Sequence, residues 1–225
     1  MEFHKPELLV VVLETSGHLA IEAALLTFCH AHLLGHRQNQ IALVAALAGT
    51  SEVVYPDGAS RADDAATADF AGFDRVVGEK LRRLETGRAT TRPAIASALS
   101  RALCFIARQT KGGGAGLAAR VLVVQQGADA PAQYNAMMNC IFAAHSRGVL
   151  IDGCMLAAEP STFLQQAAHH TNGVYLQPPQ PQARDDARPF SRRRGIATPD
   201  HAALQAGALV QYLLSLFASG AECRK

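Results

Sequence analysis

The stretch LLVVVLETSG, residues 8–17, decides the fold class of this chain. Its first six residues, Leu8 to Leu13, are all apolar and rich in valine, which favours a β-strand, and they are far too few to span a membrane. A polar loop and then a long apolar segment follow, as expected after a strand buried on both faces of a parallel sheet. Because ligands and partners gather at the carboxyl ends of such strands, function is expected near Glu14 to His18.

The rest of the chain repeats this alternation of strand and helix. Further strands are expected at 41–48, 53–55, 121–124, 149–156 and 174–176. Helices are expected at 19–35, 70–84, 95–109, 131–147, 160–170 and 202–218. The short gap between the strands 41–48 and 53–55 indicates a hairpin, and hence an antiparallel edge. The prediction is an α/β fold with a mostly parallel six-stranded sheet, one antiparallel edge strand and helices on both faces.

The predicted organisation is one domain, residues 1–218, and a short C-terminal tail, 219–225. Polar and glycine-rich composition predicts mobile loops near 56–69 and 110–117. The segment 177–200 holds five of the ten prolines and five arginines, so it is interpreted as an insertion that cannot pack a core.

Composition excludes several classes of protein. The 21 basic and 19 acidic residues give a net charge of +2, too balanced for a protein that mainly grips phosphate backbones, so no direct sequence-specific binding of nucleic acid is expected. No membrane association is expected, because no apolar run reaches the length of a membrane helix and the N-terminus lacks the form of a signal peptide. The five cysteines form no CxxC pair, which predicts reduced thiols in an intracellular protein.

Catalysis finds no support in the sequence. Neither a GxGxxG nor a P-loop motif follows any expected strand, and no cysteine has a legible histidine partner. His32 and His36 have the spacing of two zinc ligands on a helix, but no third ligand accompanies them. We therefore expect a protein that is not an enzyme, although the fold class alone would also accommodate an α/β enzyme.

Several strings in the chain carry a family resemblance. They are QY at 133–134, MN at 138–139, IFAA at 141–144, LID at 150–152, LQQA at 164–167 and QYLL at 211–214. Together they resemble the smaller von Willebrand factor A-type subunit of the general transcription and DNA repair factor TFIIH. The resemblance implies a von Willebrand A-like fold and a non-catalytic subunit of the TFIIH core. It also implies a nuclear protein that binds the RING-bearing partner subunit and other core subunits, and that serves RNA polymerase II transcription initiation and nucleotide excision repair.

The sequence departs from the pattern of metal-binding von Willebrand A domains. Those domains hold Mg²⁺ with Asp-x-Ser-x-Ser after the first strand, a threonine on a later loop and an aspartate after the fourth strand. Here the first motif begins with Glu14, continues with Ser16 and ends in a histidine, while Thr90 or Thr91 would be the threonine. The expectation is a degenerate site without metal. The alternative is a Mg²⁺-dependent ligand-binding domain that uses Glu14, Ser16 and Thr91.

No cofactor is expected in this chain. Relatives in the TFIIH family usually continue into a cysteine-rich zinc module, whereas this sequence ends at Lys225. Whether the full protein continues into such a module is left open by the residues, as is the role of the segment 177–200.

The expected helix 131–147 carries a positive signal for binding. At 100° per residue, its inward side is expected to hold Tyr134, Met137, Met138, Ile141 and His145. The side chains on the opposite side are small and nearly uncharged. Because charged residues are depleted from interface cores, this side is suited to contact with another protein. The predicted partner-docking residues are Ala132, Ala136, Asn139, Cys140, Ala143 and Arg147. The alternative interpretation is a solvent face rich in alanine because of its helix propensity.

Overall fold

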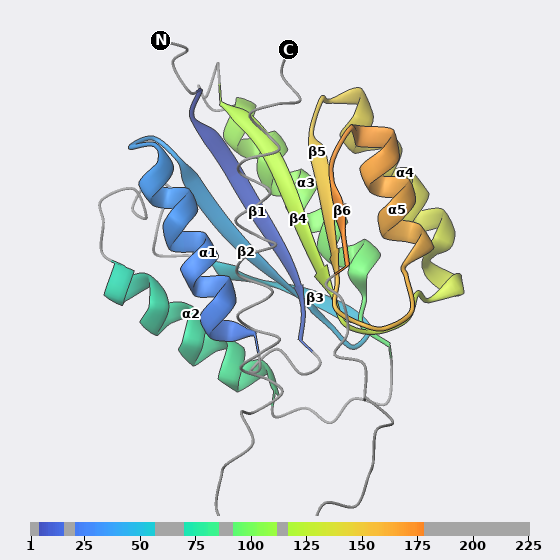
Figure 1. Cartoon of the computed structure of the whole chain (residues 1–225), viewed down its shortest axis with the longest axis horizontal. Helices are drawn as coiled ribbons and strands as arrows, with labels where there is room; N and C mark the ends of the chain where they lie inside the picture. Colours follow the sequence, from blue (N-terminus) through green and yellow to red (C-terminus); the bar gives the residue numbers. More distant parts are fainter. Residues whose placement is uncertain (1–4, 16–20, 57–69, 86–91, 112–116, 178–225) are drawn as a thin grey trace, which may run out of the picture.

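The computed structural model describes residues 5–15, 21–56, 70–85, 92–111 and 117–177. These residues form one six-stranded sheet in the order β3-β2-β1-β4-β5-β6, with helices packed on both of its faces (Figure 1). The fold class predicted from the sequence is confirmed.

Strand β1 (Glu7–Glu14) lies in the middle of the sheet. It runs parallel to β2 (Gln40–Leu47) on one side and parallel to β4 (Ala118–Gln125) on the other. The six apolar residues that begin at Leu8 are all buried, because helices cover both faces. The end of β1 therefore comes out at the centre of the carboxyl edge of the sheet.

The outer strands complete the sheet. Strand β5 (Leu150–Met155) runs parallel to β4, and the two-residue β6 (Tyr175–Leu176) runs parallel to β5. Strand β3 (Thr50–Tyr55) pairs antiparallel with β2, with an irregularity in register between Leu43 and Val44. The predicted hairpin and antiparallel edge are thus present.

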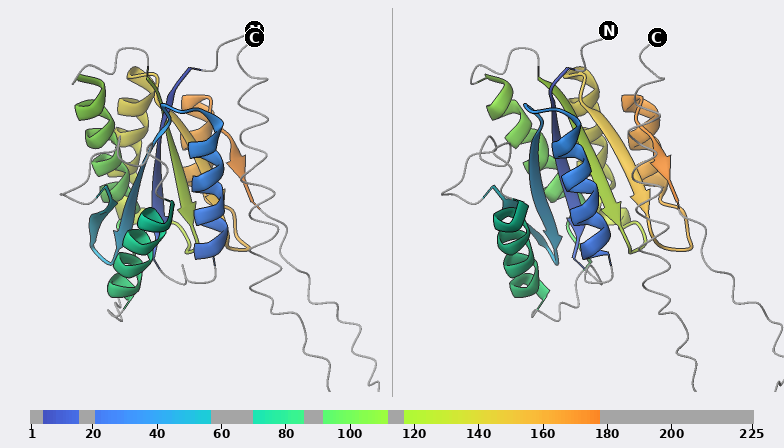
Figure 2. Two further views of the ribbon diagram at one scale, coloured as in Figure 1. Left: turned by 90° about the vertical axis from the view of Figure 1, so that its left-hand side faces the viewer. Right: turned by 60° about the vertical axis from the view of Figure 1, so that its left-hand side comes forward.

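The helices form two layers, best separated in Figure 2. Helices α1 (Glu22–Gly35) and α2 (Phe70–Glu85) cover one face, where they pack on the apolar side chains of Leu9, Val11 and Leu13. Helices α3 (Ile95–Lys111), α4 (Tyr134–Ser146) and α5 (Thr162–Thr171) cover the other, over Leu8, Val10 and Val12. Alternate residues of one strand thus feed two separate cores.

Several predicted boundaries differ from those observed. Helix α3 continues to Lys111, into the segment predicted as a loop, and the Thr110 hydroxyl donates to the carbonyl of Ile106 at 3.0 Å within that last turn. The predicted helix 131–147 begins as a 3₁₀ turn, η3 (Pro131–Gln133), before α4 starts. The expected loop 57–69, the insertion 178–200, the helix 202–218 and the tail 219–225 lie outside the described residues.

A close backbone approach fixes the turn between α5 and β6. Asn172 ends α5 in the left-handed conformation, with φ of 58°, and Gly173 then passes directly over strand β5. A Cβ atom on Gly173 would lie 2.0 Å from the carbonyl oxygen of Ile151, well inside van der Waals contact. Only glycine fits this position without a shift of the main chain.

Replacing Gly173 by alanine should therefore be severely destabilising. We expect Gly173→Ala to lower the free energy of unfolding by about 3 kcal/mol or more, because the obstructing atom belongs to the backbone and cannot rotate away. Urea unfolding followed by circular dichroism measures the change. The control is Gly35→Ala, where the nearest atom to the new Cβ is the Asn39 amide nitrogen at 3.7 Å. Similar stabilities for the two variants would contradict the close approach.

Candidate functional site

Glu14, the last residue of β1, lies at the centre of the carboxyl edge of the sheet. Its side chain is buried, with the residue 2% exposed, and its Oε2 accepts hydrogen bonds from the backbone N–H groups of Gln126 at 2.8 Å and Gly127 at 2.9 Å. These bonds tie the end of β1 to the loop after β4. A Cβ atom on Gly127 would lie 2.9 Å from Oε1 of Glu14, so a larger residue there would require the carboxylate to shift. Hydrogen bonds from two amides are a strong arrangement for a buried carboxylate.

Asp129, in the same loop, ties the edge to helix α5. Its Oδ1 accepts from the Ser161 hydroxyl at 2.5 Å and the Gln125 amide at 3.1 Å. Its Oδ2 accepts from the Thr162 hydroxyl at 3.0 Å and the Phe163 backbone N–H at 3.1 Å. Burial alone would raise the pKa of Asp129, but these donors outweigh it and hold the pKa below its ordinary value.

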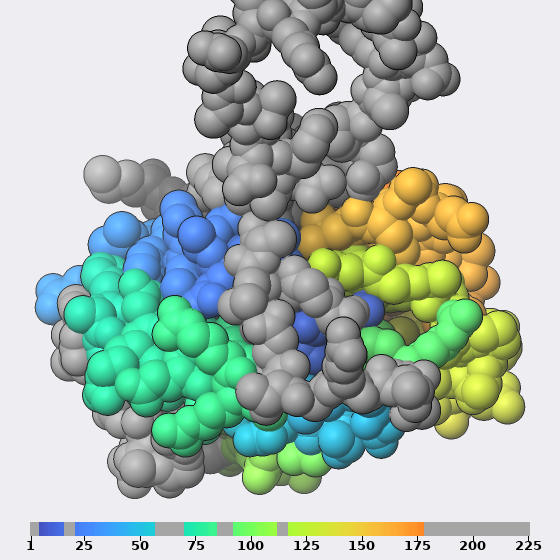
Figure 3. All heavy atoms as spheres, turned by 90° about the horizontal axis from the view of Figure 1, so that it is seen from below, coloured from blue at the N-terminus to red at the C-terminus, as the bar shows by residue number. Residues whose placement is uncertain are grey.

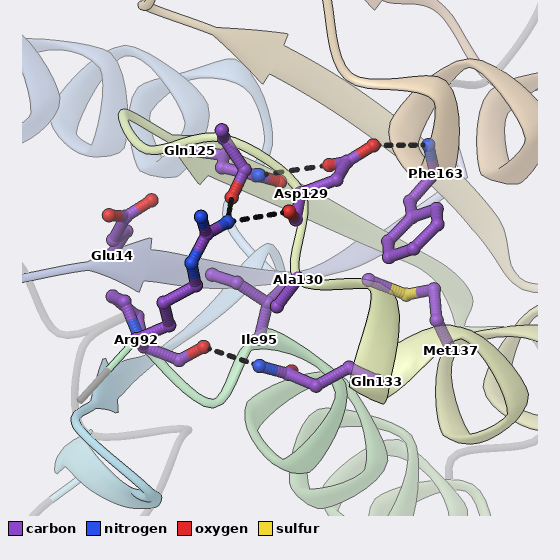
Figure 4. A pocket seen from close by; sticks show the side chains of 11 residues that line it. Glu14, Arg92, Ile95, Gln125, Asp129, Ala130, Gln133, Met137 and Phe163 are labelled. Atoms are coloured by element: carbon purple, nitrogen blue, oxygen red, sulfur yellow. Dashed lines mark hydrogen bonds between the residues drawn. The ribbon is translucent and has the colours of Figure 1, made fainter.

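Arg92 places a cationic group between these carboxylate-bearing segments. It precedes α3 and points into a hollow lined by Glu14, Gln125 and Asp129, among others (Figure 4). Its Nη1 donates to the carbonyl oxygens of Asp129 at 2.7 Å and Ala128 at 3.3 Å. The hollow holds about 320 Å³ of space, which includes its open mouth. Figure 3 views the molecule from this end, with α2 and α5 on opposite sides.

Gln133 joins the beginnings of two helices beside this hollow. Its side-chain oxygen accepts from the backbone N–H of Ala96 at 3.1 Å, and its side-chain nitrogen donates to the carbonyl of Pro93 at 2.8 Å. An N–H group in the first turn of α3, which has no partner within the helix, is thereby satisfied. The amide of Gln133 thus fixes how α3 and α4 sit against each other.

Only part of the metal site considered from the sequence can be placed. Glu14 is at the edge as expected, whereas Ser16, Thr90 and Thr91 lie outside the described residues. Sequence reasoning missed Arg92, which has no motif of its own and reaches the hollow from a distant segment. Among the described residues, no group of three or more histidine, cysteine or acidic side chains could hold a metal ion.

Helix α4 shows most of the predicted docking residues at the surface, with one correction. The exposed members are Ala132, Ala136, Asn139, Ala143 and Arg147. Cys140 is wrongly placed by the helical projection: the residue is 8% exposed and its Sγ lies 3.7 Å from the carbonyl of Ala96. The reason is that α4 packs between α3 and α5, and both neighbours cover part of its circumference.

The projection of α4 also erred on its inward side. Tyr134 is 45% exposed and His145 is exposed, although both were expected to face the sheet. Phe142, which sequence reasoning did not assign to a surface, is 55% exposed. The buried positions are Met137, Cys140, Ile141 and Ala144, the i, i+3, i+4, i+7 pattern of one helical stripe.

Comparison with known proteins decides the family. A family model described as transcription factor Tfb4 matches residues 6–184. The chain belongs to the Tfb4 family. A Schizosaccharomyces pombe relative, "General transcription and DNA repair factor IIH subunit tfb4", is 31% identical over 194 residues, which are 76% of this chain and 64% of the relative. "General transcription factor IIH subunit 3" of Dictyostelium discoideum is 30% identical over 176 residues, 68% of this chain and 46% of the relative.

Solved structures agree with the family at the level of the fold. The crystal structure of the TFIIH p34 N-terminal domain superposes with a TM-score of 0.70 at 24% identity, covering 93% of this Tfb4-family chain and 97% of that chain. The SpRpn10 VWA domain gives a TM-score of 0.55 at 11% identity, over 79% and 90% of the two chains. The fold is therefore von Willebrand A-like. The chain spans 46%, 64% and 56% of three curated relatives that it matches.

A second polar cluster of the Tfb4-family chain lies at the opposite, amino-terminal edge of the sheet. Arg120 on β4 pairs with Glu7 on β1, Nε to Oε1 at 3.3 Å, and with Asp152 on β5, Nη1 to Oδ2 at 3.1 Å. A second, small hollow is lined by Glu7, Arg120 and Asp152 and by His32 on α1, which is itself buried. Burial raises the pKa of Asp152, in spite of the adjacent arginine. The buried charges are thus paired across three neighbouring strands.

The environment of His32 disfavours its protonated form. Its Nε2 lies 3.2 Å from the carbonyl oxygen of Gln40. Burial lowers the pKa of His32, and this effect outweighs the opposing influence of Glu7.

Within the described residues, no helix is long and apolar enough to cross a membrane.

The hydrogen bonds of Asp129 should contribute measurably to stability. We expect Asp129→Ala to lower the free energy of unfolding at neutral pH by about 2 kcal/mol, since four donors lose a charged acceptor. Asp129→Asn, which keeps one carbonyl oxygen, should cost less. Because the pKa is lowered in the folded state, the contribution is present at neutral pH and is lost as the pH falls through that pKa. Chemical denaturation across pH measures this, with exposed Glu159→Ala as the control. A cost for Asp129→Ala no larger than that of the control would refute the role.

His32 should make the Tfb4-family chain sensitive to mild acid. A histidine whose pKa is lowered by folding stabilises above its unfolded pKa of about 6.5, and this contribution is lost as the pH falls. We expect the free energy of unfolding to fall below pH 6.5 by up to about 1.4 kcal/mol per pH unit more steeply in the natural chain than in His32→Gln. Denaturant titrations at several pH values compare the slopes. Parallel slopes for the two proteins would contradict this assignment.

Proposed function

We propose that this chain is a non-catalytic scaffold of the TFIIH core, acting in the nucleus in RNA polymerase II transcription initiation and nucleotide excision repair. Membership of the Tfb4 family supports the proposal, as do the names of relatives that are called general transcription and DNA repair factor IIH subunits. The described carboxylates at the carboxyl edge support it as well. Glu14 and Asp129 both accept hydrogen bonds that hold loops of the chain together.

The proposed partner is the RING-bearing subunit of the same complex, and the proposed contact is the outer face of α4, with other core subunits bound elsewhere. The observation that carries this is the surface of α4, defined here by Ala132, Ala136, Asn139, Ala143 and Arg147. Its first four members are small or uncharged, so another protein can approach closely without burying charges. The exposed ring of Phe142 beside this face adds an aromatic contact of the kind enriched at interfaces.

We further propose that the chain binds its partner without a metal or other cofactor of its own. Mg²⁺ would need oxygen ligands at about 2.1 Å in near-octahedral geometry. Oε2 of Glu14 already accepts from two amides, and the Arg92 guanidinium, bearing a positive charge, points into the adjoining hollow. A second cation there would be repelled. Of the residues of the Mg²⁺-dependent alternative, Glu14, Ser16 and Thr91, only Glu14 lies within the described residues.

Charge placed on the outer face of α4 should abolish partner binding. We expect Ala136→Glu and Ala143→Glu to prevent co-purification with the co-expressed RING-bearing subunit, because a carboxylate would be desolvated in the contact. Ala23→Glu, at an exposed position on α1 in the other helix layer, is the matched control. Circular dichroism must show that all three variants are folded. Undiminished co-purification of the folded α4 variants would contradict the proposal that the outer face of α4 binds the partner.

Chelation separates the two modes of binding. Size-exclusion chromatography of the co-expressed pair should show co-elution that survives EDTA, provided that the partner is shown to retain its own zinc. Loss of co-elution in EDTA with recovery by Mg²⁺ alone would restore the metal-dependent alternative.

A further inference from the structure

The hollow beside Glu14 contains a buried hydrogen-bond acceptor without a described partner. Gln125, the last residue of β4, is 3% exposed and lines the hollow. Its Nε2 donates to the carbonyl oxygen of Gly127 at 2.8 Å and to Oδ1 of Asp129 at 3.1 Å, which fixes the orientation of the amide. Its Oε1 is buried and accepts no hydrogen bond from the residues that the structure describes. An unpaired buried carbonyl oxygen is costly, so a donor that enters the hollow would stabilise this site.

The other amide and the nearby carboxylate of the wall are fully engaged. Each side-chain oxygen of Asp129 accepts from two donors. The amide of Gln133 is bonded through its oxygen to Ala96 and through its nitrogen to Pro93. The unpaired oxygen of Gln125 is therefore an exception in a well-connected wall, and loose construction of the hollow does not explain it.

Arg92 supplies a cation on another side of the hollow. Its Nη1 donates to the carbonyl oxygens of Ala128 and Asp129. Because a guanidinium carries five N–H groups, these two contacts to Nη1 do not saturate it. Gln125 also contacts Asp129, so the acceptor and the cation are neighbours, and Figure 4 shows both side chains beside that residue.

Three helices begin around the same hollow. Ile95 is the first residue of α3, Gln133 ends the 3₁₀ turn before α4, and Phe163 is in the first turn of α5; all three line the hollow. The N-terminal ends of helices carry partial positive charge. The first turns of α3, α4 and α5 contain no acidic residue that would offset it. These helix ends and Arg92 together favour an acceptor oxygen in the hollow.

Among the common side-chain groups, a carboxamide matches both features best. A carboxylate would accept from Arg92, but it would leave Oε1 of Gln125 unpaired and place another negative charge near Glu14. An ammonium group could donate to Oε1, but the guanidinium would repel it. A carboxamide carries a donor and an acceptor on neighbouring atoms, one for Gln125 and one for Arg92.

We propose that the hollow binds the carboxamide end of an asparagine or glutamine side chain that a partner polypeptide presents. The N–H group of the ligand would donate to Oε1 of Gln125, and its oxygen would accept from Arg92. Ile95, Met137 and Phe163 would contact its methylene groups. The enclosed part of the hollow is small and its mouth is open, so the end of one side chain fits it better than a larger ligand. The inference does not depend on the contact proposed for the outer face of α4.

Nuclear magnetic resonance titration of the ¹⁵N-labelled 225-residue chain tests the proposal. The probes are the N-acetyl methylamides of glutamine, glutamate and norleucine, which share two main-chain amides and differ at the end of the side chain. We expect the glutamine probe to shift the side-chain amide signals of Gln125 and to bind with a Kd on the order of 1 mM. The other two probes should bind at least about tenfold more weakly, because they leave Oε1 of Gln125 unpaired.

Variants of the two contacting side chains assign the site. Arg92→Ala should weaken binding of the glutamine probe on the order of tenfold, since a hydrogen bond to a charged group is lost. The matched control is Arg101→Ala, an exposed arginine on α3 that donates to the Ser51 hydroxyl at 3.1 Å, which should bind within about twofold of the natural chain. Gln125→Met should remove the preference for glutamine over norleucine. The Arg92 variant decides the question if the Gln125 variant does not fold.

Three results would overturn the proposal. Equal binding of all three probes would mean that the hollow recognises a main-chain amide. The absence of saturable shifts at Gln125, at concentrations well above the expected Kd, would mean that the hollow holds only water. Equal weakening in the Arg92 and Arg101 variants would mean that net charge, and not the hollow, determines binding.

Discussion

The complete burial of β1 is the constraint on which the rest of the structure depends. A strand that is apolar on both faces cannot lie at an edge or face water, so it requires a strand on each side and a helix layer above and below. Its end then lies at the centre of the carboxyl edge. Glu14 is therefore brought into the interior, and the backbone amides of Gln126 and Gly127 supply the hydrogen bonds that a buried carboxylate needs.

The sequence predicted what depends on local pattern and missed what depends on distant neighbours. Apolar runs gave the order of strands and helices, and the short gap before Val53 gave the antiparallel edge. The partners of Glu14 were not predictable, because they lie 112 and 113 residues away along the chain. The burial of Cys140 was missed for a related reason: the projection treated α4 as a helix on a sheet, whereas α3 also covers it. Arg92 reaches its hollow from a segment with no recognisable motif.

The carboxyl edge of the sheet and the layer of α3, α4 and α5 differ in how their charges are arranged. At the carboxyl edge, Glu14 and Asp129 are satisfied within the chain, and Arg92 donates to backbone carbonyls. In the layer of α3, α4 and α5, the described helices contain no acidic residue, and Ala132, Ala136, Asn139 and Ala143 on the outer face of α4 are uncharged. At an edge that serves as a ligand site in other folds of this class, the described carboxylates accept hydrogen bonds from within the chain.

The two edges of the described sheet bear on how such a subunit survives before it is assembled. Strand β6 has only two residues, and β3 combines a register irregularity against β2 with the exposed charge of Glu52. Short strands, bulges and charges all hinder one sheet from adding to another. A newly made chain waiting for its complex would thus be protected from edge-to-edge polymerisation, while its helices stay open to the correct neighbours.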